Sequence, residues 1–113
     1  MVLQACLEKP SVTRVTVVEL SADVIALVAP HYQERYGERL RIVHADAYTY
    51  KPDLPRYGCV WHDIWDDLCE DNLPQMTALK RKYSRRADWQ GCWSEATVRA
   101  HKRRTARAFW RFA

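Results

Sequence analysis

The stretch from residue 15 to residue 28, VTVVELSADVIALV, decides the fold class of this chain. Its first half is β-branched almost throughout, and such an apolar run is typical of a strand that is covered on both faces of its sheet. Ser21 then offers an N-cap, and Asp23 stands in the first turn, where the helix dipole favours a carboxylate. Apolar side chains recur at three- and four-residue spacing up to Tyr32, so we expect a helix over residues 22–36. A buried strand that feeds a helix predicts a parallel α/β fold.

The rest of the chain continues this alternation of strands and helices. Gly37 ends the first long helix, and residues 40–45, LRIVHA, form the second expected strand. Residues 57–63, YGCVWHD, form the third, after a loop that holds two prolines. Further helices are expected at residues 1–9, at residues 74–83 with Asn72 as the cap, and at residues 94–111, with an aromatic link over residues 89–93. We therefore predict a short parallel sheet of about three strands flanked by helices, with a helical C-terminal part.

The composition is that of an ordinary globular domain: 113 residues, of which 48% are hydrophobic and 28% are charged. This length allows one hydrophobic core. No apolar run approaches the roughly 20 residues that a membrane span needs, and the first residues lack a basic signal-peptide region. We expect a cytoplasmic protein that does not contact membranes.

The four cysteines form no C-x-x-C pair, so reduced thiols and no bound metal are expected. A zinc site built from Cys59, His62, Cys69 and Cys92 is the weaker alternative, because its irregular spacing matches no zinc finger.

The net charge of +4 conceals two segments of opposite sign. Residues 1–79 hold 7 basic and 12 acidic side chains, whereas residues 80–113 hold 11 basic and 2 acidic ones. Two interpretations of the basic segment stay open: a solvated helix face, or a surface for nucleic acid or another polyanion, with Arg103, Arg104 and Arg107 as its candidate contacts. The helical period predicts that one face of this segment packs inward and the other faces solvent. The inward set is Val98, Thr105, Phe109 and Phe112, and the outward set is Arg99, Lys102, Arg103 and Arg107.

An acidic residue stands at the end of each expected strand: Glu19, Asp46 and Asp63. If the strands are parallel, the three carboxylates meet at one edge of the sheet, which is where open α/β folds bind ligands. A carboxylate placed as Glu19 is suits the two hydroxyls of a ribose, and Asp46 suits an exocyclic amine.

Three motifs, VTVVELSADVIALV, LRIVHADAYTY and HDIWDD, resemble the class I S-adenosylmethionine-dependent methyltransferase fold over about residues 1–83, with the spermidine synthase-like branch most similar. The resemblance implies that Glu19 and the adjacent Leu20 hold the ribose of the cofactor. It likewise implies that Asp46 contacts the adenine amine and that Ala47 lies beside the ring. The implied cofactor is S-adenosylmethionine or decarboxylated S-adenosylmethionine, without a metal.

By the same resemblance, Asp63 and Asp66 have the spacing of the two aspartates of polyamine synthases. Asp63 would contact the cofactor and deprotonate or orient an attacking amine, and Asp66 would bind the cationic end of the substrate. The alternative is that both cap the following helix. Trp61 and Trp65 would either face a sulfonium or ammonium ion or pack in the core.

The sequence departs from the family at its cofactor-binding turn. It contains no G-x-G, since its only glycines are Gly37, Gly58 and Gly91. The family's first strand, which lies between its second and fourth, is likewise not evident. We expect the gap to be closed by direct pairing of the strands at 15–20 and 57–63, or by a strand from a second copy or a partner chain.

These observations predict a partial methyltransferase-like domain over residues 1–83 and a basic helical extension over 84–113 packed on it. The expected function is nucleoside binding, with weak or no methyl- or aminopropyltransferase activity. The alternative is a basic nucleic-acid-binding protein, or one that completes a sheet in another protein.

Overall fold

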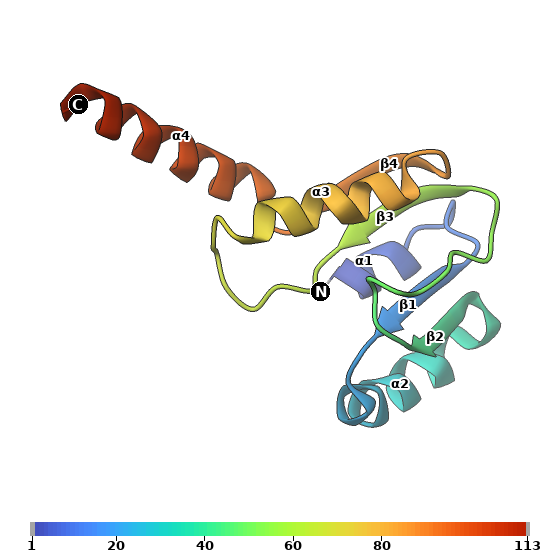
Figure 1. Cartoon of the computed structure of the whole chain (residues 1–113). Helices are drawn as coiled ribbons and strands as arrows, with labels where there is room; N and C mark the ends of the chain where they lie inside the picture. The colour runs from blue at the N-terminus through green and yellow to red at the C-terminus, as the bar shows by residue number, and fades with distance from the viewer. Residues whose placement is uncertain (1, 113) are drawn as a thin grey trace. The chain divides into compact units, whose positions relative to one another are not determined.

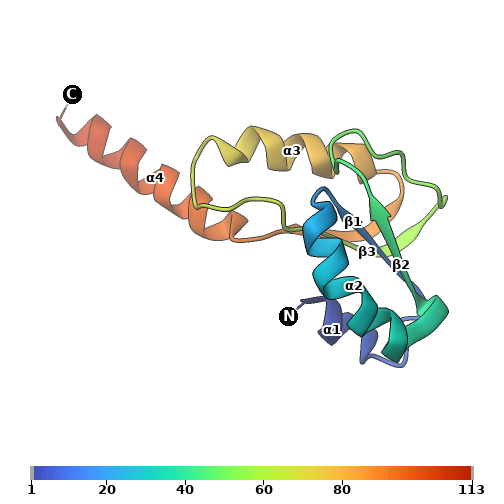
Figure 2. The same ribbon diagram turned by 90° about the horizontal axis from the view of Figure 1, so that it is seen from below.

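The computed structural model describes the backbone of residues 2–112 and the side chains of residues 2–111. The chain forms two compact units, Met1–Lys51 and Pro52–Ala113. Each unit holds one pair of parallel strands and the helix that connects them (Figures 1 and 2). Because adjacent parallel strands need a crossover, both units are βαβ arrangements.

The first unit contains a short helix, a strand, a long helix and a second strand. The two strands pair in register from Val15 opposite Leu40 to Glu19 opposite His44. The elements are, in order, α1 (Val2–Leu7), β1 (Val15–Glu19), α2 (Ala22–Tyr36), the 3-10 turn η1 (Gly37–Arg39) and β2 (Leu40–His44).

Local sequence signals set the ends of α2. The Ser21 hydroxyl accepts a hydrogen bond from the Val24 N–H at 3.2 Å, as an N-cap does. Gly37 ends the helix at φ +57°, a left-handed conformation that favours glycine. The bounds of α2 are those that the sequence predicts.

The core of the first unit is small. Leu7, Tyr32 and Leu40 are buried together, and partly buried side chains from β1 and α2 surround them. Arg39 adds a polar tie, because its Nη2 donates to the carbonyls of Leu7 and Val12, both at 2.8 Å. The connection between α1 and β1 is thereby held against the start of β2.

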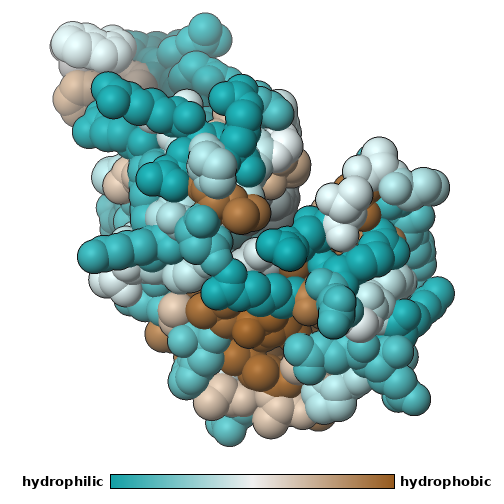
Figure 3. Space-filling view, turned by 90° about the vertical axis from the view of Figure 1, so that its right-hand side faces the viewer, coloured by the Kyte–Doolittle hydropathy of each residue, from teal (hydrophilic) through white to brown (hydrophobic). Residues whose placement is uncertain are grey.

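The prediction that the first strand is covered on both faces is wrong. Every residue of β1 is only half-buried. Leu20 is 67% exposed, and Leu27 on α2 is 83% exposed. Figure 3 shows apolar side chains gathered in a brown area in the lower half of the view, at the height of β1, β2 and α2 in Figure 1. Two strands and one long helix are too few elements to cover all the apolar side chains of this unit.

The second unit repeats the strand, helix, strand order and adds a terminal helix. Its elements are β3 (Tyr57–His62), α3 (Asn72–Tyr83), β4 (Ala87–Cys92) and α4 (Glu95–Phe112). Strands β3 and β4 pair in register from Tyr57 opposite Ala87 to His62 opposite Cys92. The helix α3 packs on both strands. The core of the second unit is built from Leu73, Met76, Cys92 and Val98.

The expected sheet of about three strands is not confirmed. Among the described residues, β1 pairs with β2 and β3 pairs with β4, in two sheets of two strands each. The parallel α/β class is confirmed. The segment ADWQGC, expected in part as an aromatic link, is instead the strand β4. Gly91 and the lack of β-branched residues hide this strand from the sequence pattern.

The helix α4 forms as expected, but its inward face is wrong beyond the second turn. Val98 is buried at 3% exposure, whereas Thr105 is exposed and Phe109 is 68% exposed. The side chain of Phe112 lies outside the described residues. From His101 to Arg111 every residue is exposed, and α4 runs away from α3 and β4 (Figures 1 and 2). In the described part of the chain, no helix has the length and apolar character needed to cross a membrane.

Met76 is fully buried and Phe109 is exposed, and this difference in burial can be tested by measuring stability. Met76→Ala should lower the free energy of unfolding by about 2–5 kcal/mol, because it leaves a cavity in the core of the second unit. Phe109→Ala should change it by no more than about 0.5 kcal/mol, because the ring is exposed. Urea denaturation followed by circular dichroism measures both. A large loss of stability with Phe109→Ala would show that this ring packs inward, as the sequence predicts.

Candidate functional site

Two of the predicted site carboxylates lie together at one edge of the first sheet. Glu19 is the last residue of β1, and Asp46 follows the neighbouring parallel strand β2 by two residues. The Ala45 N–H donates to the Glu19 carbonyl at 3.1 Å, so the pairing continues to the point where both strands end. This is the carboxyl edge, the location of ligand sites in open α/β sheets.

Backbone donors orient both carboxylates. Glu19 Oε1 accepts the Ser21 N–H at 2.9 Å, and Asp46 Oδ1 accepts the Tyr48 N–H at 2.8 Å. Among the described residues, these are the only hydrogen bonds that the two carboxylates make. Since a carboxylate has two acceptor oxygens, each retains capacity for a ligand donor.

The two residues that flank these carboxylates differ in exposure. Leu20 is largely exposed, and its carbonyl is bonded to His44 Nε2 at 2.9 Å. Ala47 is half-buried in the turn that follows Asp46. An apolar surface therefore lies next to the polar acceptors, as a nucleoside site requires.

The other predicted pair, Asp63 and Asp66, lies in the exposed segment between β3 and α3 of the second unit. Neither caps α3. That helix begins at Asn72, whose Nδ2 donates to the Asp67 carbonyl at 2.9 Å, and Asp71 stands at the N-cap position. The convergence of Glu19, Asp46 and Asp63 in one crevice joins residues of the two units and stays a prediction.

The two tryptophans near these aspartates have different roles. Trp65 packs against the core of the second unit, and its Nε1 donates to Gln75 Oε1 at 2.8 Å. The core-packing alternative therefore holds for Trp65. Trp61 is 38% exposed and lies parallel to Trp89, with an angle of 4° and ring centroids 6.2 Å apart.

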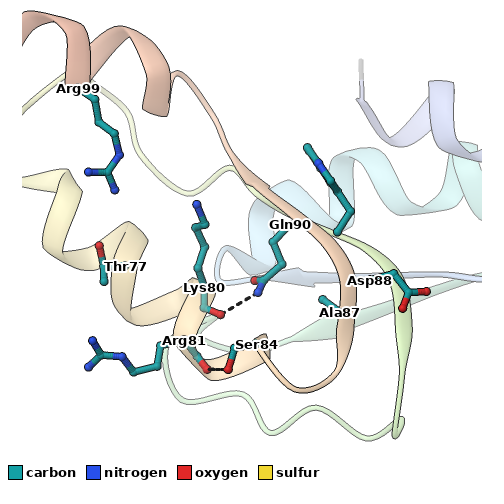
Figure 4. A pocket seen from close by; sticks show the side chains of 9 residues that line it. Thr77, Lys80, Arg81, Ser84, Ala87, Asp88, Gln90 and Arg99 are labelled. Atoms are coloured by element: carbon teal, nitrogen blue, oxygen red, sulfur yellow. Dashed lines mark hydrogen bonds between the residues drawn. The ribbon is translucent and has the colours of Figure 1, made fainter.

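A groove of about 620 Å³ lies in the second unit, beside β4. We call it the basic groove, because its charged side chains are mostly cationic. Figure 4 shows Arg99 of α4 and Lys80 of α3 pointing into the space between these helices, with Gln90 of β4 beside Lys80. Its lining residues are Thr77, Lys80, Arg81, Ser84, Ala87, Asp88, Trp89, Gln90 and Arg99. The predicted contacts Arg103, Arg104 and Arg107 are exposed further along α4.

Glu95 holds two cations of the groove in place. It is bonded to Lys80 Nζ at 3.1 Å and to Arg99 Nη2 at 3.1 Å, and its side chain is only 14% exposed. Burial alone would raise the pKa of this carboxyl group. The hydrogen bonds from Lys80 and Arg99 outweigh burial and lower the pKa below its ordinary value of 4.5. The carboxylate is therefore ionised at neutral pH.

Gln90 forms the floor of the groove through a chain of polar contacts. Its Nε2 donates to the Lys80 carbonyl at 2.8 Å, and its Oε1 accepts from His62 Nε2 at 3.0 Å. Burial lowers the pKa of His62, so the ring is neutral at neutral pH and carries its proton on Nε2. The sequence pattern missed Trp89 and Gln90 as site residues because it missed β4.

The alternative zinc site does not assemble. Trp89 pairs with Cys59, and His62 pairs with Cys92, so the register places Cys59 and Cys92 on opposite faces of the sheet. All four cysteines are free, and burial raises the pKa of Cys92 to about 11. In residues 2–111, no group of three or more His, Cys, Asp or Glu side chains is placed to hold a metal ion.

A scan against protein-family models gives no match, and searches of the curated proteins and of the solved structures find no significant similarity.

The ion pairs of Glu95 with Lys80 and Arg99, which we call the clamp, predict a pH-dependent contribution to stability. Since the pKa of this group is lower in the folded chain, its contribution is present above pH 4.5 and is lost as the pH falls through the lowered pKa. Glu95→Gln should therefore lower the free energy of unfolding at pH of about 7 and much less at pH of about 3. Urea denaturation at the two pH values measures this. Glu34→Gln, on the exposed surface of α2, is the control, and an equal loss at both pH values would contradict the clamp.

Proposed function

We propose that this chain is a nucleoside-binding protein of the class I S-adenosylmethionine-dependent methyltransferase type, most similar to its spermidine synthase-like branch. The observation that carries the proposal is the position of Glu19 and Asp46 at the carboxyl ends of two neighbouring parallel strands. The βαβ order of both units supports it, since open α/β folds of this type are assembled from such units.

In this proposal each carboxylate recognises one part of the nucleoside. Glu19 accepts hydrogen bonds from the ribose hydroxyls, and Asp46 accepts one from the exocyclic amine of adenine. Leu20 and Ala47 supply the apolar contacts to sugar and base. The backbone bonds from Ser21 and Tyr48 support these roles, because they fix the direction of both carboxylates before a ligand arrives.

The proposed reaction class is transfer of a methyl or aminopropyl group from S-adenosylmethionine or its decarboxylated form. The bound cofactor supplies an electrophilic carbon next to a sulfonium. Asp63 is the proposed acceptor for the proton that an attacking amine sheds, and Asp66 the proposed contact for the cationic end of that amine. The activity expected of this chain is weak or absent, because its sequence offers no G-x-G turn for the methionyl end.

A partner strand is part of this proposal. Among the described residues, β1 pairs on one side only, with β2. Its second edge presents backbone donors and acceptors that a strand from another chain or a second copy can satisfy.

Ligand titration tests the nucleoside site. S-adenosylmethionine should bind with a Kd of about 0.1–1 mM, and adenosine should bind within about threefold of it, because only the nucleoside part is held. Glu19→Gln and Asp46→Asn should each raise the Kd about tenfold, since each removes a charged acceptor. Isothermal titration calorimetry measures these affinities.

Glu34→Gln serves as the control in this experiment, because it removes the same charge at the other end of α2. Submicromolar affinity for S-adenosylmethionine would mean that another segment replaces the missing turn. Affinity that is unchanged by both carboxylate variants would reject the nucleoside site.

A further inference from the structure

The second unit carries two features that the nucleoside site does not use. One is the basic groove, and the other is the parallel pair of Trp61 and Trp89, which we call the tryptophan pair. Trp89 belongs to both features, since it also lines the groove. The indole of Trp89 lies on the face of the sheet opposite to the side chain of Gln90, so the two features meet at the outer edge of β4.

The tryptophan pair lies on the face of the β3–β4 sheet that carries Cys59 and Gly91, opposite the face that carries His62 and Cys92. His62 and Cys92 are buried, whereas Trp61 and Trp89 are 38% and 55% exposed. Most tryptophans in a sheet bury their rings in the core, so two exposed parallel indoles indicate a surface for a flat apolar group.

Gly91 makes this arrangement possible. A Cβ at this position would lie 2.5 Å from Trp89 Cη2 and 2.8 Å from Trp61 Cζ3. Both indoles therefore lie over a backbone position that only glycine leaves open, although its φ is not in the left-handed region.

The charge balance of the groove favours an anionic ligand. Lys80 and Arg99 share the single carboxylate of Glu95, and Arg81 adds a further exposed cation. Asp88 is the other carboxylate at the groove, and it is bonded to Arg56. Counting Arg56, four cationic side chains thus lie in or beside the groove with the two carboxylates of Glu95 and Asp88. Along α4, Arg103 and Arg107 follow Arg99 at four-residue intervals and extend the same face of the helix.

We propose that the tryptophan pair and the basic groove together bind single-stranded nucleic acid. Unpaired bases stack on Trp61 and Trp89 on one face of the sheet. The strand then passes the outer edge of β4, and its following phosphates contact Lys80, Arg81 and Arg99 on the other face. Aromatic side chains beside a basic groove are the combination that holds single strands with little sequence preference. A duplex is excluded from this mode, because its bases are already stacked and paired.

Fluorescence anisotropy of a labelled oligothymidylate of about 15 nucleotides, added to the full chain, tests the proposal. Binding is expected at about 50 mM salt, and the affinity should fall about 20-fold by about 200 mM if three phosphates are contacted. A duplex of the same length should bind at least about tenfold more weakly. Equal affinity for the duplex, or no binding at low salt, would overturn the proposal.

Substitutions separate stacking from charge. Trp89→Ala should raise the Kd for the oligonucleotide about tenfold, whereas Trp110→Ala, which removes an exposed indole on α4, should change it less than twofold. Arg81→Gln should weaken binding and reduce its salt dependence, whereas Arg14→Gln removes the same charge from the other unit with little effect. Circular dichroism confirms that each variant is folded.

Two further measurements keep the test decisive if Trp89→Ala does not fold. Gly91→Ala should weaken binding, because the added methyl group displaces both indoles while every charge remains. In the unmodified chain, the oligonucleotide should quench tryptophan fluorescence, and the absence of quenching would reject stacking. A glutamate-rich peptide of equal charge is the competitor: if it displaces the oligonucleotide equally well, the surface recognises an extended acidic chain and the proposal is wrong.

Discussion

Pairing of only two parallel strands makes each sheet depend on the helix that connects its strands. A two-stranded sheet is at best marginal in water, so its stability comes from the helix packed on one face. In the first unit α2 provides Tyr32, and in the second unit α3 provides Leu73 and Met76. The opposite faces receive no such cover from their own connecting helix, which accounts for the half-buried β1 and for the exposed tryptophan pair.

An arginine performs the same structural task in each unit. Arg39 donates to two carbonyls of the α1–β1 connection, and Arg86 donates to the carbonyls of Pro52 and Leu54 in front of β3. Each guanidinium thus holds the segment that enters one strand against the start of its neighbour. Its planar set of donors suits this role, because one side chain can satisfy two separated backbone acceptors.

The strength of the local signal explains which parts of the fold were predictable. Ser21 and Gly37 punctuate α2 by backbone chemistry that acts within a few residues, so its bounds follow from the sequence. Strand β4 has no such signal, because Gly91 is retained for the indoles above it. The inward face of α4 was wrong beyond the second turn for a different reason: periodicity identifies which residues share a face, but it does not supply the element that covers that face. The adjacency of Glu19 and Asp46 followed from strand order alone, whereas the groove depends on β4.

The distal half of α4 can lose its helical structure independently of the rest of the chain. His101 is bonded to Glu70, and the residues from there to Arg111 are all exposed. A helical segment of this length without tertiary packing is marginal in water. Its cations also repel one another, which disfavours the helix at low ionic strength. Helical order in this segment is therefore a local equilibrium that responds to warming and to salt. It should fray gradually, well before the packed cores of the two units unfold cooperatively.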